Sequence, residues 1–113
     1  MKIYLAGPMR GIPEFNFPAF HAAAKLLRYR GNEVFNPAER DEQEGFNPKE
    51  HPAGDMTKAL EGGFSLRKAL AADTEYICLH ADAIAMLPGW EHSGGARAEH
   101  ALACTLRHTI IYL

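Results

Sequence analysis

The fold is decided by residues 2–36, which read KIYLAGPMRGIPEFNFPAFHAAAKLLRYRGNEVFN. Residues 2–6 are a short apolar run closed by Gly-Pro, which is typical of a buried strand that ends in a tight turn. A helix is predicted over residues 17–30, because apolar residues recur there at helical spacing and Asn16 can cap its start. Residues 33–35 form a second short strand, so the stretch predicts a parallel strand–helix–strand unit.

The alternation of strands and helices continues toward the C-terminus. Helices are predicted over residues 66–80 and 93–107, and strands over residues 83–87 and 109–113. Residues 38–63 show no sustained periodicity, and we expect a long loop there, of the kind that is usually functional or disordered. The pattern predicts that residues 1–113 form one domain, a small three-layer α/β sandwich with a mainly parallel sheet of the Rossmann or flavodoxin-like kind. Ligands bind outside the carboxyl ends of the strands in such folds.

The composition is that of a globular protein, with 47% hydrophobic and 23% charged residues. The net charge of −2 leaves no cationic surplus for binding a nucleic-acid polymer. We expect no membrane span or signal peptide, because no apolar run is long enough. Cys78 and Cys104 have no metal-ligand spacing, which predicts reduced core thiols in a cytoplasmic protein without a metal site.

The strongest local signal is Ser93-Gly94-Gly95 at the start of the last helix. Free N–H groups and the helix dipole favour an anion at such a position, and glycine allows a phosphate to approach closely. Ser93 could also be a simple N-cap, although a cap does not need two glycines that weaken the helix. Arg10, in the turn after the first strand, is either a second phosphate contact or a solvated charge.

Each of the last two predicted helices carries one carboxylate on its apolar face. The predicted stripes are Leu66, Leu70, Asp73 and Ile77 on one helix and Gly95, Glu99, Leu102 and Leu106 on the other. A buried carboxylate is costly unless it is paired or used, and two in one pocket often divide into a nucleophile and an acid. The alternatives are an exposed Glu99 and an Asp73 at an ordinary boundary between helices.

Two further candidates lie in the loop before the last helix. Trp90 follows a Pro-Gly turn and could stack on a base, although a lone tryptophan more often belongs to a core or an interface. His92 lies in the same loop, and the histidines of the chain show no metal-ligand spacing.

Together these motifs resemble those of the nucleoside 2-deoxyribosyltransferase superfamily, especially its small bacterial and phage members, over nearly the whole chain. The matching pieces are Tyr4 to Gly11 (YLAGPMRG), Asp73 followed nine residues later by Asp82, and Ser93-Gly94-Gly95-Ala96 leading to Glu99. The resemblance implies that Glu99 is the nucleophile, that Tyr4 orients it, and that Asp73 assists departure of the base.

The resemblance also assigns binding roles. It implies phosphate contacts from Ser93, Gly94, Gly95 and Arg10, and sugar or base contacts from Gly7, Met9, Trp90 and His92. It implies a small-molecule nucleotide or nucleoside as substrate, no cofactor, and a homo-oligomer.

One departure from the family pattern concerns Ser93. Relatives that use free nucleosides carry an aspartate there, which would repel a phosphate, whereas relatives that hydrolyse nucleoside 5′-monophosphates carry serine. The expected reaction is therefore hydrolysis of the N-glycosidic bond of a nucleoside or deoxynucleoside 5′-monophosphate. The alternatives are base exchange, a phosphoribohydrolase with a loosely similar Pro-Gly and Gly-Gly motif, and a non-catalytic nucleotide-binding module.

Overall fold

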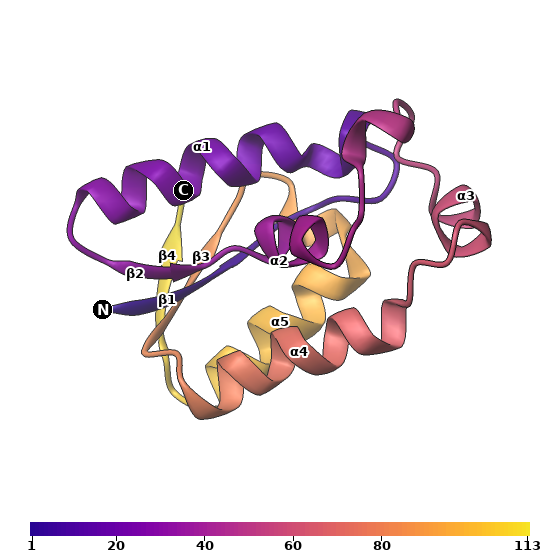
Figure 1. The fold of residues 1–113 in the computed structure, drawn as a ribbon. Helices are drawn as coiled ribbons and strands as arrows, with labels where there is room; N and C mark the ends of the chain where they lie inside the picture. Colours follow the sequence, from indigo (N-terminus) through magenta and orange to yellow (C-terminus); the bar gives the residue numbers. More distant parts are fainter.

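A computed structural model describes all 113 residues as one four-stranded sheet between two layers of helices (Figure 1). The strands are β1 (Lys2–Ala6), β2 (Glu33–Phe35), β3 (Ala83–Met86) and β4 (Thr109–Tyr112), and the helices are α1 (Phe17–Tyr29), α2 (Pro37–Gln43), α3 (Met56–Glu61), α4 (Leu66–Leu79) and α5 (Gly94–Thr105). All neighbouring strands pair in parallel, in the order β2-β1-β3-β4. The predicted three-layer α/β fold is confirmed.

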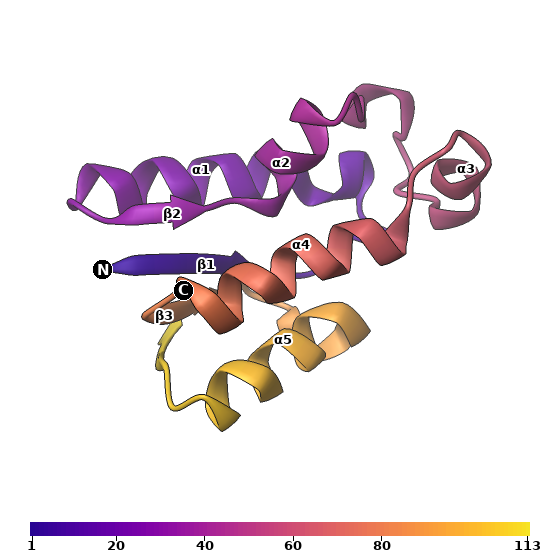
Figure 2. The same ribbon diagram turned by 60° about the horizontal axis from the view of Figure 1, so that its bottom comes forward.

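Residues of β1 alternate between the two faces of the sheet, as the pleat of a strand requires. Ile3 and Leu5 belong to the core beneath α1, whereas Tyr4 and Ala6 belong to the core beneath α4 and α5. Figure 2 shows α1 on one side of the sheet and α4 and α5 on the other. Since β1 is central and buried on both faces, its side chains are fixed by packing, and Tyr4 is held on the α4 and α5 side.

The expectation of one long loop over residues 38–63 is wrong. This stretch contains α2, a 3-10 turn at Pro48–Glu50 and α3. Asn36 caps α2, since its side-chain oxygen accepts from the Ala38 N–H at 3.0 Å, and Asp55 caps α3 in the same manner. Both helices are too short to show an apolar stripe in the sequence, so their N-cap residues are the main sequence signal of where they begin.

The loop between β1 and α1 takes an unusual path. Glu14, Phe15 and Asn16 all have left-handed φ angles, of 55°, 53° and 64°. Each such residue costs about 1–2 kcal/mol, and here the buried Phe15 ring offsets that cost by packing in the core. The prediction that the Asn16 side chain caps α1 is wrong, because its amide donates to the Pro8 carbonyl at 2.9 Å.

The buried faces of α4 and α5 differ in part from the predicted stripes. The buried residues are Ala69, Asp73 and Ile77 on α4 and Ala96, Glu99 and Ala103 on α5. Leu106 is 41% exposed, and it lies at the C-cap, after the last residue of α5. Cys78 and Cys104 are free but exposed, so their prediction as core thiols is wrong. No helix in the structure combines the length and the apolarity of a membrane span.

Candidate functional site

A cavity of about 670 Å³ opens at the carboxyl ends of β1 and β3. At this point the connections diverge, because the helix after β1 covers one face of the sheet and the helix before β3 covers the other (Figure 2). Such a switch point is where ligands bind in doubly wound α/β folds. Its walls come from the β1–α1 loop, the middle of α4, the start of α5, and residues of α2 and α3.

The Tyr4 hydroxyl donates a hydrogen bond of 2.5 Å to Glu99 Oε2 at the base of this cavity. Tyr4 is 1% exposed and Glu99 is 6% exposed, so the contact is shielded from water. The Tyr4 ring stacks on Phe35 with centroids 5.5 Å apart, which holds the hydroxyl in place. The pair joins a strand residue to a helix residue 95 positions later, as the predicted orienting contact requires.

Asp73 enters the same cavity from α4 and is 7% exposed. Its Oδ1 atom is buried and has no hydrogen-bond partner. The structure therefore brings together Tyr4, Asp73 and Glu99, the three residues predicted to carry the chemistry.

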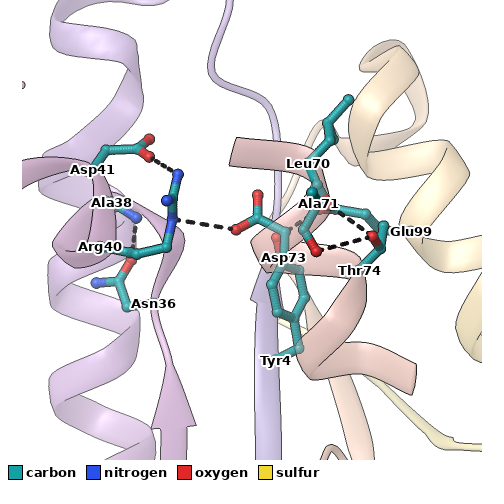
Figure 3. Close-up of polar contacts among 10 residues, drawn as sticks. All are labelled: Tyr4, Asn36, Ala38, Arg40, Asp41, Leu70, Ala71, Asp73, Thr74 and Glu99. Atoms are coloured by element: carbon teal, nitrogen blue, oxygen red, sulfur yellow. Dashed lines mark hydrogen bonds and ion pairs between the residues drawn. The ribbon is translucent and has the colours of Figure 1, made fainter. Parts of the chain in front are cut away.

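Figure 3 shows an arginine between two carboxylates beside this group, an arrangement that the sequence did not predict. Arg40 Nη2 lies 2.7 Å from Asp41 Oδ1, and Arg40 Nε lies 3.8 Å from Asp73 Oδ1. Arg40 and Asp41 come from α2, whose polar sequence does not indicate burial, yet Asp41 is only 6% exposed. The one available signal was Asn36-Pro37 after the second strand, because asparagine at an N-cap followed by proline typically starts a helix.

Burial raises the pKa values of both carboxyl groups in the cavity. The pKa of Glu99 rises to about 8, chiefly through desolvation, while the Tyr4 hydrogen bond opposes the rise and the charge of Asp73 adds to it. The pKa of Asp73 rises to about 7 through desolvation and the nearby charge of Asp41, against the attraction of Arg40. Near neutral pH the pair holds about one proton, and the order of the two pKa values places it mainly on Glu99, with Asp73 as the carboxylate.

The opposite wall of the cavity is the start of α5. Ser93 is the N-cap, and its hydroxyl accepts from the Ala96 N–H at 3.2 Å. The Gly94 and Gly95 N–H groups lie in the first turn and have no helical acceptor. A Cβ atom at either glycine would meet nothing within 4 Å, so neither glycine is required by packing. Open space and free donors at this position suit an anion.

Two other predicted residues border this cavity from exposed positions. Arg10 and His92 are exposed, and both line the cavity wall. They are therefore available to a ligand, Arg10 as a cation and His92 as a donor or acceptor.

The remaining three predicted contacts have different fates. Gly7 and Met9 line the cavity, and Gly7 must also be glycine for packing, because a Cβ there would lie 2.6 Å from Leu87 Cβ. Trp90 does not line the cavity. Its ring stacks on His100 with centroids 4.3 Å apart and packs against the core beneath α5. The alternative, that a lone tryptophan serves packing, describes its position.

The side of the cavity away from α5 is mainly apolar. Its residues include Met56, Phe64, Leu66 and Leu70, beside the carboxyl groups of Asp41 and Asp73. Leu66 and Leu70 are half-buried, because one side of each faces the cavity and is not packed against other residues. Concave, mostly apolar walls with a few polar groups are typical of small-molecule pockets.

Comparison with known proteins identifies a family. Residues 1–112 match the model of the family DUF4406, described as a domain of unknown function. None of the curated proteins matches the chain. Because the match covers all but the last residue, the chain belongs to the DUF4406 family.

Proposed function

We propose that the protein hydrolyses the N-glycosidic bond of a nucleoside or deoxynucleoside 5′-monophosphate through a covalent glycosyl ester on Glu99. The observation that carries the proposal is the buried 2.5 Å contact between Tyr4 and Glu99 in a cavity that also holds Asp73. A carboxylate in apolar surroundings needs a use or a partner, and here a tyrosine positions it.

The chemistry divides between two carboxyl groups. The Glu99 carboxylate attacks C1′ of the sugar through an oxocarbenium-like transition state, and the glycosidic electron pair leaves with the base. The reactive form has Glu99 ionised and Asp73 protonated, the reverse of the order of their pKa values, so the shared proton moves to Asp73 before the attack. Asp73 then gives this proton to the departing base nitrogen. In the second step Asp73 accepts a proton from water, the resulting hydroxide attacks C1′, and Glu99 leaves as a carboxylate.

The start of α5 supports a 5′-phosphate on the substrate. Two free N–H groups and the positive end of the helix dipole favour a dianion there, and Gly94 and Gly95 leave space for its oxygen atoms. Ser93 adds no negative charge to this wall. A free nucleoside would leave these donors without an anionic partner.

We further propose that the protein is a cytoplasmic homo-oligomer. Cys78 and Cys104 are free and exposed, which suits a reducing compartment. The edge strand β4 carries the 62% exposed Tyr112, and Leu113 after it is 41% exposed, so this sheet edge has apolar surface for a second copy. Light scattering coupled to gel filtration tests the assembly, and a monomer at micromolar concentration would contradict it.

The proposed activity is tested by incubating the protein with a panel of nucleosides and their 5′-monophosphates and separating the products by chromatography. The expected result is free base from 5′-monophosphates, and none from the Glu99→Gln variant, which keeps the shape of the side chain. Release from unphosphorylated nucleosides alone would refute the phosphate site. Exchange with an added second base would indicate a transferase, and tight binding without turnover would indicate a binding module.

A further inference from the structure

Two complementary buried atoms face each other in the site without forming a hydrogen bond. Arg40 Nε is a donor and Asp73 Oδ1 is an acceptor, and both are buried without any hydrogen-bond partner. The atoms are 3.8 Å apart, slightly less than 1 Å beyond the usual hydrogen-bond length of about 2.9 Å. Unsatisfied buried groups are costly, and two that lie so close can satisfy each other after a small movement.

The position of Arg40 is fixed by other contacts. Its Nη2 atom is held at 2.7 Å by Asp41, which is itself buried. Asn36 caps α2 and thereby sets the direction in which this helix presents Arg40. The guanidinium therefore remains beside Asp73 whether or not the two are in contact.

Among the groups that shift the pKa of Asp73, Arg40 is the one cation. Asp41 faces it from α2, Tyr4 from β1 and Glu99 from α5, and the first and last of these carry negative charge when ionised. Loss of a proton from Asp73 adds a further negative charge to this cluster. A guanidinium offers several N–H donors in a rigid fork, so Arg40 can contact two carboxylates at once.

We propose that Arg40 is a positioning residue that forms a hydrogen bond with Asp73 when Asp73 gives its proton to the departing base. The inference rests on the proposed function and adds a residue to it. As the glycosidic bond breaks, the proton moves from Asp73 to the base nitrogen, and the Arg40 Nε–H donates to the new carboxylate. When Asp73 regains a proton from water in the second step, this contact opens again.

The resting state fits this cycle. Desolvation and Asp41 raise the pKa of Asp73 to about 7, so the group keeps its proton in part at neutral pH. The contact with Arg40 favours the charged form of Asp73, which proton transfer to the base produces. Arg40 therefore stabilises the product of proton transfer more than its reactant.

The test uses 5′-monophosphates of the base class that the wild type releases, varied in the acidity of the leaving base. Arg40→Gln is expected to lower kcat/KM at least tenfold for the poorest leaving base and less than threefold for the most acidic one, which needs little protonation. Arg28→Gln is the matched control, because Arg28 pairs with Glu39 of α2 at the surface and should change neither value. A uniform loss across the series, or no loss, overturns the inference.

A titration of Asp73 by NMR gives a second readout. Its pKa is expected to rise in Arg40→Gln, and an unchanged pKa overturns the inference. If Arg40→Gln does not fold, Arg40→Lys must show the same dependence on the leaving base in weaker form, because lysine keeps the charge without the fork. If the wild type releases no base from any nucleotide, the proposed function fails and the inference falls with it, whereas a uniform loss removes the inference alone.

Discussion

Replacing Tyr4 by phenylalanine should raise the pKa of Glu99. The change removes only the hydroxyl that donates to Glu99 Oε2 at 2.5 Å and keeps the ring that stacks on Phe35. This hydrogen bond lowers the Glu99 pKa, which lies at about 8 in its presence. A hydrogen bond to a charged group contributes about 1.5–3 kcal/mol, and one pKa unit corresponds to about 1.4 kcal/mol. The Glu99 pKa should therefore rise to roughly 9–10 in Tyr4→Phe.

The change in pKa has a calculable effect on the nucleophile. At pH 7.5 about a quarter of Glu99 is ionised when its pKa is about 8, and this fraction should fall on the order of 10- to 100-fold in the variant. The rate of base release at that pH should fall by a similar factor. The sign follows from the charge, because the lost donor stabilised the carboxylate and not the acid.

The assay is an NMR titration of protein labelled with ¹³C at the glutamate carboxyl carbons, in which Glu99→Gln identifies the signal. Tyr112→Phe is the matched control, since it removes an exposed hydroxyl that contacts His100 outside the cavity. Its Glu99 pKa should equal that of the wild type. An unchanged or lower Glu99 pKa in Tyr4→Phe would refute the assigned role of the hydroxyl.

Two further predictions concern stability and phosphate binding. The carboxyl pKa values of Glu99, Asp73 and Asp41 are all raised on folding, to about 8, 7 and 6, so the native state keeps protons that the unfolded chain releases. The stability that these groups contribute is complete below about pH 4 and is lost as the pH rises through these values. The free energy of unfolding, measured with urea, should therefore decline from about pH 5 to 8.5, and the decline should be smaller in Glu99→Gln. Parallel curves for the two proteins would contradict the burial argument. Gly95→Ala places a methyl group in open space and improves helix propensity, so unfolding should require equal or slightly more urea. In a Glu99→Gln background, the same change should raise the Kd for a 5′-monophosphate at least tenfold. The Kd for the corresponding nucleoside should not rise. Equal losses for both ligands would remove the phosphate from this wall.

The long elements of the fold and the main carboxylates of the site were predictable from the sequence. The strand at residues 2–6 and the helix after it are indicated by the pattern of apolar residues and by the Gly and Pro residues that bound them. In a parallel sheet the carboxyl ends of the strands lie at one edge. That geometry is why Tyr4, Asp73 and Glu99, far apart in the chain, could be predicted to meet. This prediction required only the order of the strands and helices and the presence of a carboxylate on the apolar face of a helix.

The Arg40–Asp41 pair could not be predicted in the same way. It lies on α2, a helix of seven residues in a charged stretch, which is too short for an apolar period to appear. Its burial comes from packing against α1 and α4, which are distant in sequence. Trp90 illustrates the same limit, because the three-dimensional position of His100 decides that its ring packs beside α5 and does not line the cavity.

The covalent role of Glu99 is tested most directly by trapping its ester. The protein is incubated with a 5′-monophosphate that carries fluorine at C2′, which destabilises the oxocarbenium-like transition state and slows hydrolysis of the intermediate. Mass spectrometry should show the protein heavier by the fluorinated sugar phosphate, with the added mass on the peptide that contains Glu99 and absent from Glu99→Gln. Release of the base without any adduct, or an adduct on another residue, would contradict nucleophilic attack by Glu99.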